Sequence, residues 1–600
     1  MHAFLIALSL ASTLCSQDPD PSPESPGYPE LELRDDLVVT QSAKIKAGEY
    51  LIADQGEPGV LIIRGEGVRV NMEGVVLRGA PEGSPPDQLQ GIGIRLDQTK
   101  GGQLIGGAVH GFRIGVEAFQ CEGGLIEKVD ASDNFAQKLK STPEKMDDGD
   151  WLDIHDPERW RTYGASFWLQ DCTQMQILSN RSRRSQNGIV AIRSHSLQIR
   201  ENDCSFHSGW GLAFHQSTGN VVTRNRFDYC VREESWGRYS RGGDSAGILL
   251  VHGSSKNRII GNSATHGGDG FFLTSGPPPA HREFTSDQNV VQFNDFSHSP
   301  HNAIEATFSR GNQFIGNHCS DSGYGFWLGY AQDCQVLSND IHNSLHDAIA
   351  IEWGENNKIR QNRISRTRGT GIRLWKRGEQ PMVEAVHRGN VVRQNQMDYN
   401  NVAIRVHDME GGVIRGNRLL GNAWDADVQN APEAIPNNTS AHRNLLEKPA
   451  RSQEWVQAGT EKILPLKKKP LHRLAFQFHW DPIHDGEQDL LVLEMTRVEN
   501  PGPDDWQRLR LVHGRDWPLV SIQFRQARKF QALRWRLLKD LKGFQVPRRH
   551  LAGSPLNPPL PVPTEVQIPP VPPPGQSPRP AGRRYIRIGE FFPLPPQEED

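Results

Sequence analysis

The sequence has few cysteines, little net charge and no long hydrophobic run after its first residues. Seven cysteines are spread over 600 residues without a CxxC pair, so a thiolate metal site is not indicated and buried free thiols are expected. The formal net charge of -4 argues against a nucleic-acid-binding protein, because such proteins carry marked basic patches. No later apolar run approaches the length of a membrane-spanning helix, so no transmembrane segment is expected.

What the sequence does have is an asparagine that recurs every 22 or 23 residues, with wider intervals where insertions fall. The recurring residues are Asn180, Asn202, Asn225, Asn262, Asn294, Asn317, Asn339, Asn362, Asn395 and Asn417. Between them a small residue is followed by alternating apolar positions, as in Gly270-Phe-Phe-Leu. One period therefore holds two short strands, which are too few to bury a face unless the repeats stack on one another.

Repeats of this length, without leucine runs or helical periodicity, predict a parallel β-helix whose coils stack about 4.8 Å apart. Equivalent residues of successive coils then form ladders. Asparagine suits a ladder at a turn because it tolerates left-handed backbone angles and its amide can bond the asparagine of the next coil. We therefore expect each ladder asparagine to hold a turn rather than to contact a ligand. Cys204 and Cys319, each two residues after a ladder asparagine, are expected in the core.

These repeats resemble the right-handed parallel β-helix repeats of the pectate-lyase-like superfamily, including its carbohydrate-binding and sugar-hydrolase type and its periplasmic copper-accessory type. The resemblance covers roughly residues 35–435. It implies an all-β chain, a single-stranded right-handed solenoid followed by a small β-rich C-terminal domain. Because this scaffold hosts lyases, hydrolases, epimerases and non-catalytic binders, the function has to be argued from the site.

The chain outside the repeats divides into three further parts. Residues 1–16 read as a signal peptide with a short apolar core, which predicts a secreted, periplasmic or cell-surface protein. Residues 452–546 contain alternating apolar runs and predict the small β-rich domain. Residues 547–600 form a Pro-rich linker and tail.

Four insertions interrupt the repeats around the glycine strands. Residues 130–163 and 231–244 leave the turn that precedes these strands, and residues 275–286 and 377–387 leave their far end. Loops on both edges predict a binding groove on the outer face of the glycine strands, between residues 246 and 375.

Alternation within the glycine strands decides which side chains face outward. The first outward column reads Val190, Ala213, Leu249, Phe272, Glu305, Trp327, Ala350, Arg373 and Arg405. A second, two residues on, contains Thr274, Thr307, Glu352 and Trp375. The flanking aromatic residues should desolvate Glu305 and raise its pKa, as a general acid requires. Strand geometry places the Cα atom of Glu352 roughly 11 to 12 Å from that of Glu305, so the two carboxyl groups could approach an inverting glycosidase pair but hardly a retaining one.

The predicted sugar contacts lie on or beside these columns. They are Phe272, Trp327, Tyr330, Trp353, Trp375 and Arg373. Aromatic residues and single acids also decorate β-helix surfaces that bind nothing, and that reading stays open.

A second constellation gathers at the turn before the same strands. Candidate catalytic residues there are Asp244, His266, Asp269 and His301, with Tyr239 and Arg241 approaching from the second insertion. A lyase or epimerase acting on a uronate needs a cation for the carboxylate and a base for the neighbouring proton, which Arg241 with a histidine or Tyr239 could supply. Calcium held by Asp and His is an open alternative, because oxygen ligands suit it. Asp and His also form turns and caps without further function.

The sequence thus predicts an exported β-helix protein that binds polysaccharide and cleaves it as a glycoside hydrolase or polysaccharide lyase. The alternative is a non-catalytic carbohydrate-binding or cell-surface protein. Metal delivery, suggested by the copper-accessory branch, has little support in a chain with 8 methionines and no Met-His cluster.

Overall fold

The computed structural model describes residues 27–431 apart from 57, 141–146, 233–244, 276–283, 300 and 379–384, and the backbone of six strand segments between 439 and 537. In this part of the chain nearly all regular structure is β. The exceptions are the short helix α1 (Pro157–Tyr163) and two 3-10 turns, η1 (Pro86–Gln88) and η2 (Asp148–Asp150). The predicted signal peptide and most of the residues after 431 lie outside the described residues.

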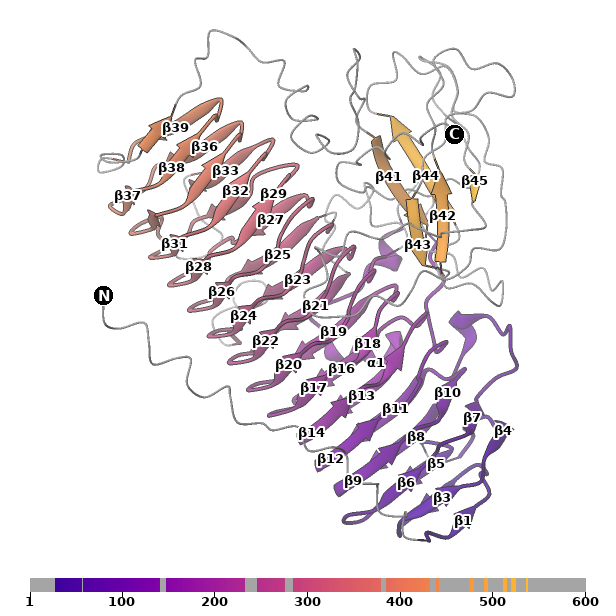
Figure 1. Ribbon diagram of the computed structural model, residues 1–600. Coiled ribbons are helices and arrows are strands. Elements are labelled where there is room, and N and C mark those ends of the chain that lie inside the picture. The colour runs from indigo at the N-terminus through magenta and orange to yellow at the C-terminus, as the bar shows by residue number, and fades with distance from the viewer. Residues whose placement is uncertain are drawn as a thin grey trace, which may run out of the picture.

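Two long parallel sheets run the length of the solenoid, and Figure 1 shows their strands stacked as successive rungs from β1 to β39. The sheet that carries the glycine strands, called the glycine sheet below, contains β2 (Leu37–Val39), β5 (Leu61–Ile63), β8 (Ile92–Asp97), β11 (Ile114–Phe119), β13 (Ala165–Gln170), β16 (Ile189–Ile192), β19 (Trp210–His215), β21 (Ala246–Val251), β23 (Asp269–Thr274), β25 (Asn302–Thr307), β27 (Tyr324–Trp327), β30 (Ile349–Glu352), β33 (Thr370–Trp375), β36 (Val402–His407) and β39 (Trp424–Gln429).

The second long sheet ends at the ladder asparagines and is called the asparagine sheet. It contains β1 (Glu30–Leu31), β3 (Ala43–Ile45), β6 (Arg69–Asn71), β9 (Lys100–Ile105), β12 (Glu122–Glu127), β14 (Thr173–Leu178), β17 (Gln198–Arg200), β20 (Val221–Thr223), β22 (Arg258–Ile260), β24 (Val290–Gln292), β26 (Gln313–Ile315), β28 (Gln335–Leu337), β31 (Lys358–Arg360), β34 (Val391–Arg393) and β37 (Val413–Arg415).

A third side of the coil is made of shorter parallel pieces. They are β4 (Gly48–Leu51), β7 (Val75–Arg78) and β10 (Ala108–His110), then β15 (Arg181–Ser182) and β18 (Asp203–Cys204), then β29 (Asp340–His342), β32 (Arg363–Ser365), β35 (Gln396–Asp398), β38 (Arg418–Leu420) and β40 (Thr439–Ala441). Single bridges, such as Ser263 with Asp295, continue this side through the coils between β18 and β29. The three-sided coil confirms the predicted parallel β-helix.

The register of the glycine sheet agrees with the predicted outward columns. Phe272 pairs with Glu305, Glu305 with Trp327, and Arg373 with Arg405. Inward side chains on either side of Glu305, such as Ile304, are fully buried in one continuous core. The six cysteines among the described residues are buried and free, as expected from the absence of a paired motif.

The asparagine ladder holds one corner of the coil through buried side-chain bonds. The Asn225 amide nitrogen donates to Asn262 Oδ1 at 3.0 Å, and that of Asn262 donates to Asn294 Oδ1 at 3.0 Å. Each amide also reaches a strand carbonyl of the neighbouring coil, as Asn262 does with Val222 at 3.0 Å. The expected amide ladder is therefore present. The left-handed angle, however, belongs to the residue before each asparagine, for example Arg224 with φ 55°.

The insertion at 130–163 differs from the prediction, because it folds over the outer face of the glycine sheet instead of framing it. Leu152, Ile154, Trp160 and Tyr163 form a second apolar cluster with outward residues of β13 to β23. The Trp160 ring lies 4.5 Å from that of Trp210. The expected groove is thus covered over its first coils.

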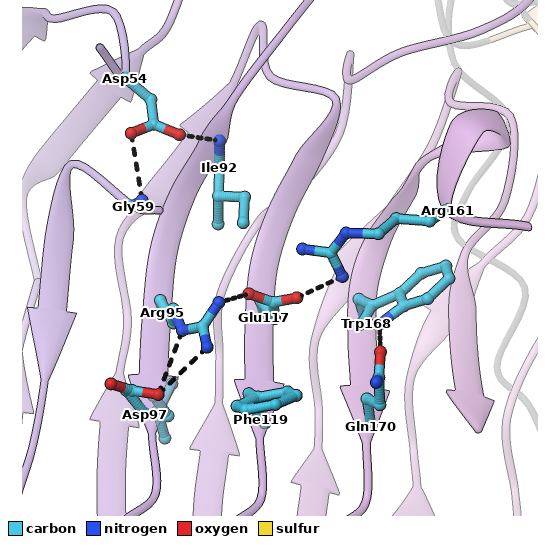
Figure 2. A network of polar contacts seen from close by, with 12 residues as sticks. Asp54, Gly59, Ile92, Arg95, Asp97, Glu117, Phe119, Arg161, Trp168 and Gln170 are labelled. Atoms are coloured by element: carbon cyan, nitrogen blue, oxygen red, sulfur yellow. Dashed lines mark hydrogen bonds and ion pairs between the residues drawn. The ribbon is translucent and has the colours of Figure 1, made fainter. Parts of the chain in front are cut away.

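A polar network anchors this cover to the sheet (Figure 2). The fully buried Glu117 accepts hydrogen bonds from Arg95 at 2.8 Å and from Arg161 of α1 at 2.7 Å. Arg113 adds a bond to the carbonyl of Thr162 at 2.8 Å. A buried carboxylate needs such partners, because an unpaired charge there is costly.

The described strands after residue 450 pair antiparallel. β41 (Leu474–His479) pairs with β44 (Leu519–Phe524), and β42 (Leu490–Glu494) pairs with β43 (Leu511–Gly514) and β45 (Arg536–Leu537). These strands agree with the β-rich composition, while the domain boundaries stay a prediction. No helix in the described part of the chain is long and apolar enough to cross a membrane.

Replacing Asn262 by alanine should lower stability by about 1–3 kcal/mol, because it leaves the backbone N–H of Asn225 and the carbonyl of Val222 buried without their partner. Urea unfolding followed by circular dichroism measures the shift. The matched control is Arg258→Ala, which removes an exposed side chain from the strand of the same coil. Equal unfolding curves for the two variants would contradict the ladder's role.

Replacing Arg161 by alanine should loosen α1 while the solenoid stays folded, because Glu117 keeps Arg95, whereas α1 loses its bond to Glu117 and keeps the bond between Arg113 and Thr162. The loss is about 1–2 kcal/mol, since the Arg161 side chain is partly exposed. Hydrogen exchange of the peptide spanning 150–164 should become faster. Arg159→Ala, on the same helix but with a more exposed side chain, is the control, and unchanged exchange in both variants would refute the anchor.

Candidate functional site

The uncovered outer face of the glycine sheet begins at β25, directly after the cover. Phe272 on β23 is 7% exposed, whereas Glu305, Trp327 and Arg373 on later strands reach the surface in part. Because outward positions of successive parallel strands stack in register, these side chains form one line along the solenoid.

Asp269, His301 and Glu305 meet at the start of β23 and β25. His301 Nδ1 lies 3.0 Å from Asp269 Oδ1 and 3.9 Å from Glu305 Oε2. Asp269 has no exposed surface, so it contacts the outside only through His301, whose side chain is 35% exposed. Glu305 lies on the outer face beside them with 14% of its side chain exposed.

Asn302 joins these three residues. Its side-chain amide donates to Glu305 Oε2 at 2.6 Å, and its backbone N–H donates to Asp269 Oδ1 at 2.7 Å. Two buried acceptors, Asp269 Oδ2 and Asn302 Oδ1, have no hydrogen-bond partner among the described residues. Unsatisfied buried acceptors are uncommon in proteins and often accompany functional sites.

All three pKa values are shifted upward, by burial for the two carboxyl groups and by the neighbouring carboxylate for His301. Burial raises the pKa of Glu305, and the charge of Asp269 raises it further. Burial likewise raises the pKa of Asp269. Burial alone would lower the pKa of His301, but the carboxylate of Asp269 outweighs it and the net shift is upward. Near neutral pH the site therefore favours a protonated imidazole and a protonated Glu305.

Aromatic rings and one cation continue the site on the next coils. The Trp327 ring lies 5.1 Å from Tyr324 and 5.8 Å from Trp375. Arg373 lies 4.2 Å over the Trp375 ring and 3.4 Å from Asp347. Aromatic rings in edge contact beside a fixed cation can bind sugar faces and a carboxylate.

A metal ion is conceivable only at the same three residues within the described part of the chain. Asp269, His301 and Glu305 each offer one ligand atom within 4.8 Å of the others. Two oxygens and one imidazole nitrogen differ from the six to eight oxygens that calcium takes, so the donor set does not favour the calcium alternative.

Several predicted site residues lie elsewhere. His266 lies at a turn. Its ring stacks 4.5 Å from that of Tyr229 and 4.7 Å from that of His298, outside the triad of Asp269, His301 and Glu305. Tyr330 and Trp353, predicted to stack on sugars, are 8% and 7% exposed and lie at the far turn of the coil.

Two further predictions need correction in part. Phe272 does flank Glu305 but is buried at the edge of the cover. Glu352 lies beside Trp375, where burial raises its pKa while Arg377 and Arg373 oppose the shift; the carboxyl group that meets Glu305 is that of Asp269. Tyr239, Arg241 and Asp244 lie outside the described residues.

Sequence reasoning missed Asn302 and Tyr324. Both occupy the ladder position of Asp269, the residue before the small residue that opens each glycine strand. Aligning that position as well as the outward columns would have placed them beside the triad.

Comparisons with known proteins agree with the architecture. The family described as right handed beta helix region matches residues 242–387, and the family described as periplasmic copper-binding protein (NosD) matches residues 69–266. No curated protein sequence matches the chain.

The chain also matches solved structures, among them three with sequence identities of 10 to 12% to this chain. The A-module of a mannuronan C-5 epimerase from Azotobacter vinelandii is 12% identical, with a TM-score of 0.39, and the match covers 68% of this chain and 92% of that one. A periplasmic alginate epimerase is 11% identical, with a TM-score of 0.31, over 64% and 77%. The Family 28 exopolygalacturonase of Yersinia enterocolitica is 10% identical, with a TM-score of 0.28, over 69% and 79%.

Replacing Asp269 by asparagine should lower the pKa of His301, because the carboxylate that outweighs burial is then lost. Titration of labelled histidines by NMR measures the change. His318, whose raised pKa depends on Asp340 and Asp295 on the third side of the coil, serves as the internal control and should not move. An unchanged His301 titration would contradict the coupling.

Proposed function

This chain is a right-handed parallel β-helix protein, and we propose that it cleaves polysaccharide on the outer face of the glycine sheet. The observation that carries the proposal is Glu305, a mostly buried carboxyl group that contacts the Asp269–His301 pair on the surface where a glycan could lie. A carboxyl group with a raised pKa stays protonated near neutral pH and can donate its proton to a glycosidic oxygen.

In this proposal Asp269 and His301 support Glu305. Asp269 orients the imidazole through Nδ1, which leaves Nε2 for the substrate side. When Glu305 gives up its proton, the cationic His301 beside it stabilises the new carboxylate. Asn302 holds the Glu305 side chain in place through its amide.

The neighbouring rings would provide the sugar-binding surface. Trp327 and Trp375 lie in contact on the outer face, with Tyr324 at the strand start. Arg373 is held between Trp375 and Asp347, which fixes its guanidinium beside the rings. A fixed guanidinium favours a substrate that carries carboxylates.

Hydrolysis and elimination both use a general acid, and they differ in the second group. Hydrolysis needs a base that activates water, whereas a lyase needs a base that removes a sugar proton and leaves an unsaturated product. Asp269 cannot act directly as either base, because its side chain is buried and reaches the substrate side only through His301.

A non-catalytic polysaccharide-binding protein is the second candidate. The aromatic contacts among Tyr324, Trp327 and Trp375 favour this candidate, because they do not involve Asp269, His301 or Glu305 and could bind a sugar without catalysis. In either case we propose a secreted, periplasmic or cell-surface location, on the basis of the apolar segment in residues 1–16.

Replacing Glu305 by glutamine should reduce cleavage by at least about 100-fold while leaving binding intact, because the proton donor is lost but the shape is kept. Purified protein is incubated with neutral and uronate polysaccharides, with and without calcium, following reducing ends and ultraviolet absorbance. Reducing ends without absorbance identify hydrolysis, and both together identify elimination.

The matched control is Glu410→Gln, which makes the same chemical change at an exposed position. Its activity should equal that of the wild type. Full activity of Glu305→Gln would remove Glu305 from the mechanism, and binding without turnover of any polymer by the wild type would favour the binding protein.

A further inference from the structure

The outer face of the glycine sheet is closed on the N-terminal side of Glu305. The outward residues Val190, Ala213 and Leu249 of β16, β19 and β21 each have no exposed surface. Phe272, on the strand directly before Glu305, is 7% exposed and belongs to the same apolar cluster.

The cover contacts these strands at both of their ends. At their start, Trp160 of α1 packs 4.5 Å from the ring of Trp210. Leu152 of the insertion is fully buried and belongs to the same apolar cluster as Leu249. At their far end, His155 Nδ1 lies 2.8 Å from His252 Nε2. These contacts place a wall of described residues over β19 and β21, two coils before the strand of Glu305.

On the C-terminal side the same face is accessible. Trp327, Arg373, Trp375 and Arg405 are all partly exposed, and they follow Glu305 on β27, β33 and β36. Coils of a β-helix are spaced about 4.8 Å apart, which is comparable to the length of one sugar unit in a chain. A glycan lying along this line could thus extend over several coils from Glu305 in one direction only.

We propose that the site takes the end of a polysaccharide chain and not its interior. The proposal rests on the proposed function, since it assumes that the glycan lies over Glu305 and the rings that follow. The wall leaves room for about one or two sugar units beyond Glu305, because only the coil of Phe272 separates the coil of Glu305 from β21. Each reaction then releases a terminal unit, and the rest of the chain lies over Trp327, Arg373 and Trp375.

The test follows two quantities on every polymer that the wild-type protein cleaves: the number of new chain ends and the viscosity of the solution. New ends should accumulate while the viscosity stays high, with mono- or disaccharides present from the first time point. A rapid fall in viscosity with long fragments overturns end recognition and leaves the proposed cleavage intact.

Loosening the wall supplies the matched variant. Arg161→Ala removes the bond between α1 and Glu117 and should lengthen the products, whereas Arg159→Ala should leave product lengths unchanged. If hydrogen exchange shows that α1 is loosened in Arg161→Ala and the products still do not lengthen, the wall does not set the mode of action.

Oligosaccharide binding distinguishes failure of the proposed cleavage from failure of end recognition. If no polymer is cleaved, oligogalacturonate, oligomannuronate and xylo-oligosaccharides are titrated into the wild-type protein, either free or with a bulky cap on both ends. Binding that is lost on capping supports end recognition without catalysis. Equal binding of capped and free oligosaccharides, or no binding at all, overturns it.

Discussion

The ladder of asparagine side chains is the interaction on which the rest of the molecule depends. Each amide bonds both the next asparagine and a strand carbonyl of the neighbouring coil, so every coil is held in one register against the next. A slip of one residue would turn the outward column into the core. The alignment of Glu305 with Phe272 and Trp327 is thus a consequence of the corner that holds the strands.

The Asp269–His301–Glu305 cluster places ionisable groups in a scaffold that is built around a continuous apolar core. On other strands the same ladder position holds apolar residues such as Ala246 and Val402, whereas here a carboxyl group with no exposed surface keeps one oxygen without a partner among the described residues. Burial and mutual repulsion would drive such groups to share protons, and the imidazole between them makes that possible. An arrangement that costs stability and concentrates exchangeable protons at a surface is what proton-transfer chemistry needs.

The insertion at 130–163 decides how much of the repeated face can be used. The repeat itself offers the same outward column from β13 to β36, and nothing in its periodicity distinguishes one coil from another. Apolar residues of the insertion bury the first coils, while the Glu117–Arg161 bonds hold α1 against the sheet. The site begins where this cover ends, and its one-sided access follows from the same contact.

The solenoid, its coil length, the outward columns and the candidacy of Glu305 can all be predicted from the sequence, because they depend on a period that recurs along the chain. Asparagine spacing and strand alternation are local signals, and parallel stacking converts them directly into ladders. The other features of the site are visible only in the folded protein. The structure places Asp269, and not Glu352, near Glu305, and it places His266 in a stack at the turn. It also buries Tyr330 and Trp353 and folds an insertion over the face. These outcomes depend on side-chain direction at turns and on the path of an irregular segment, for which the period carries no information.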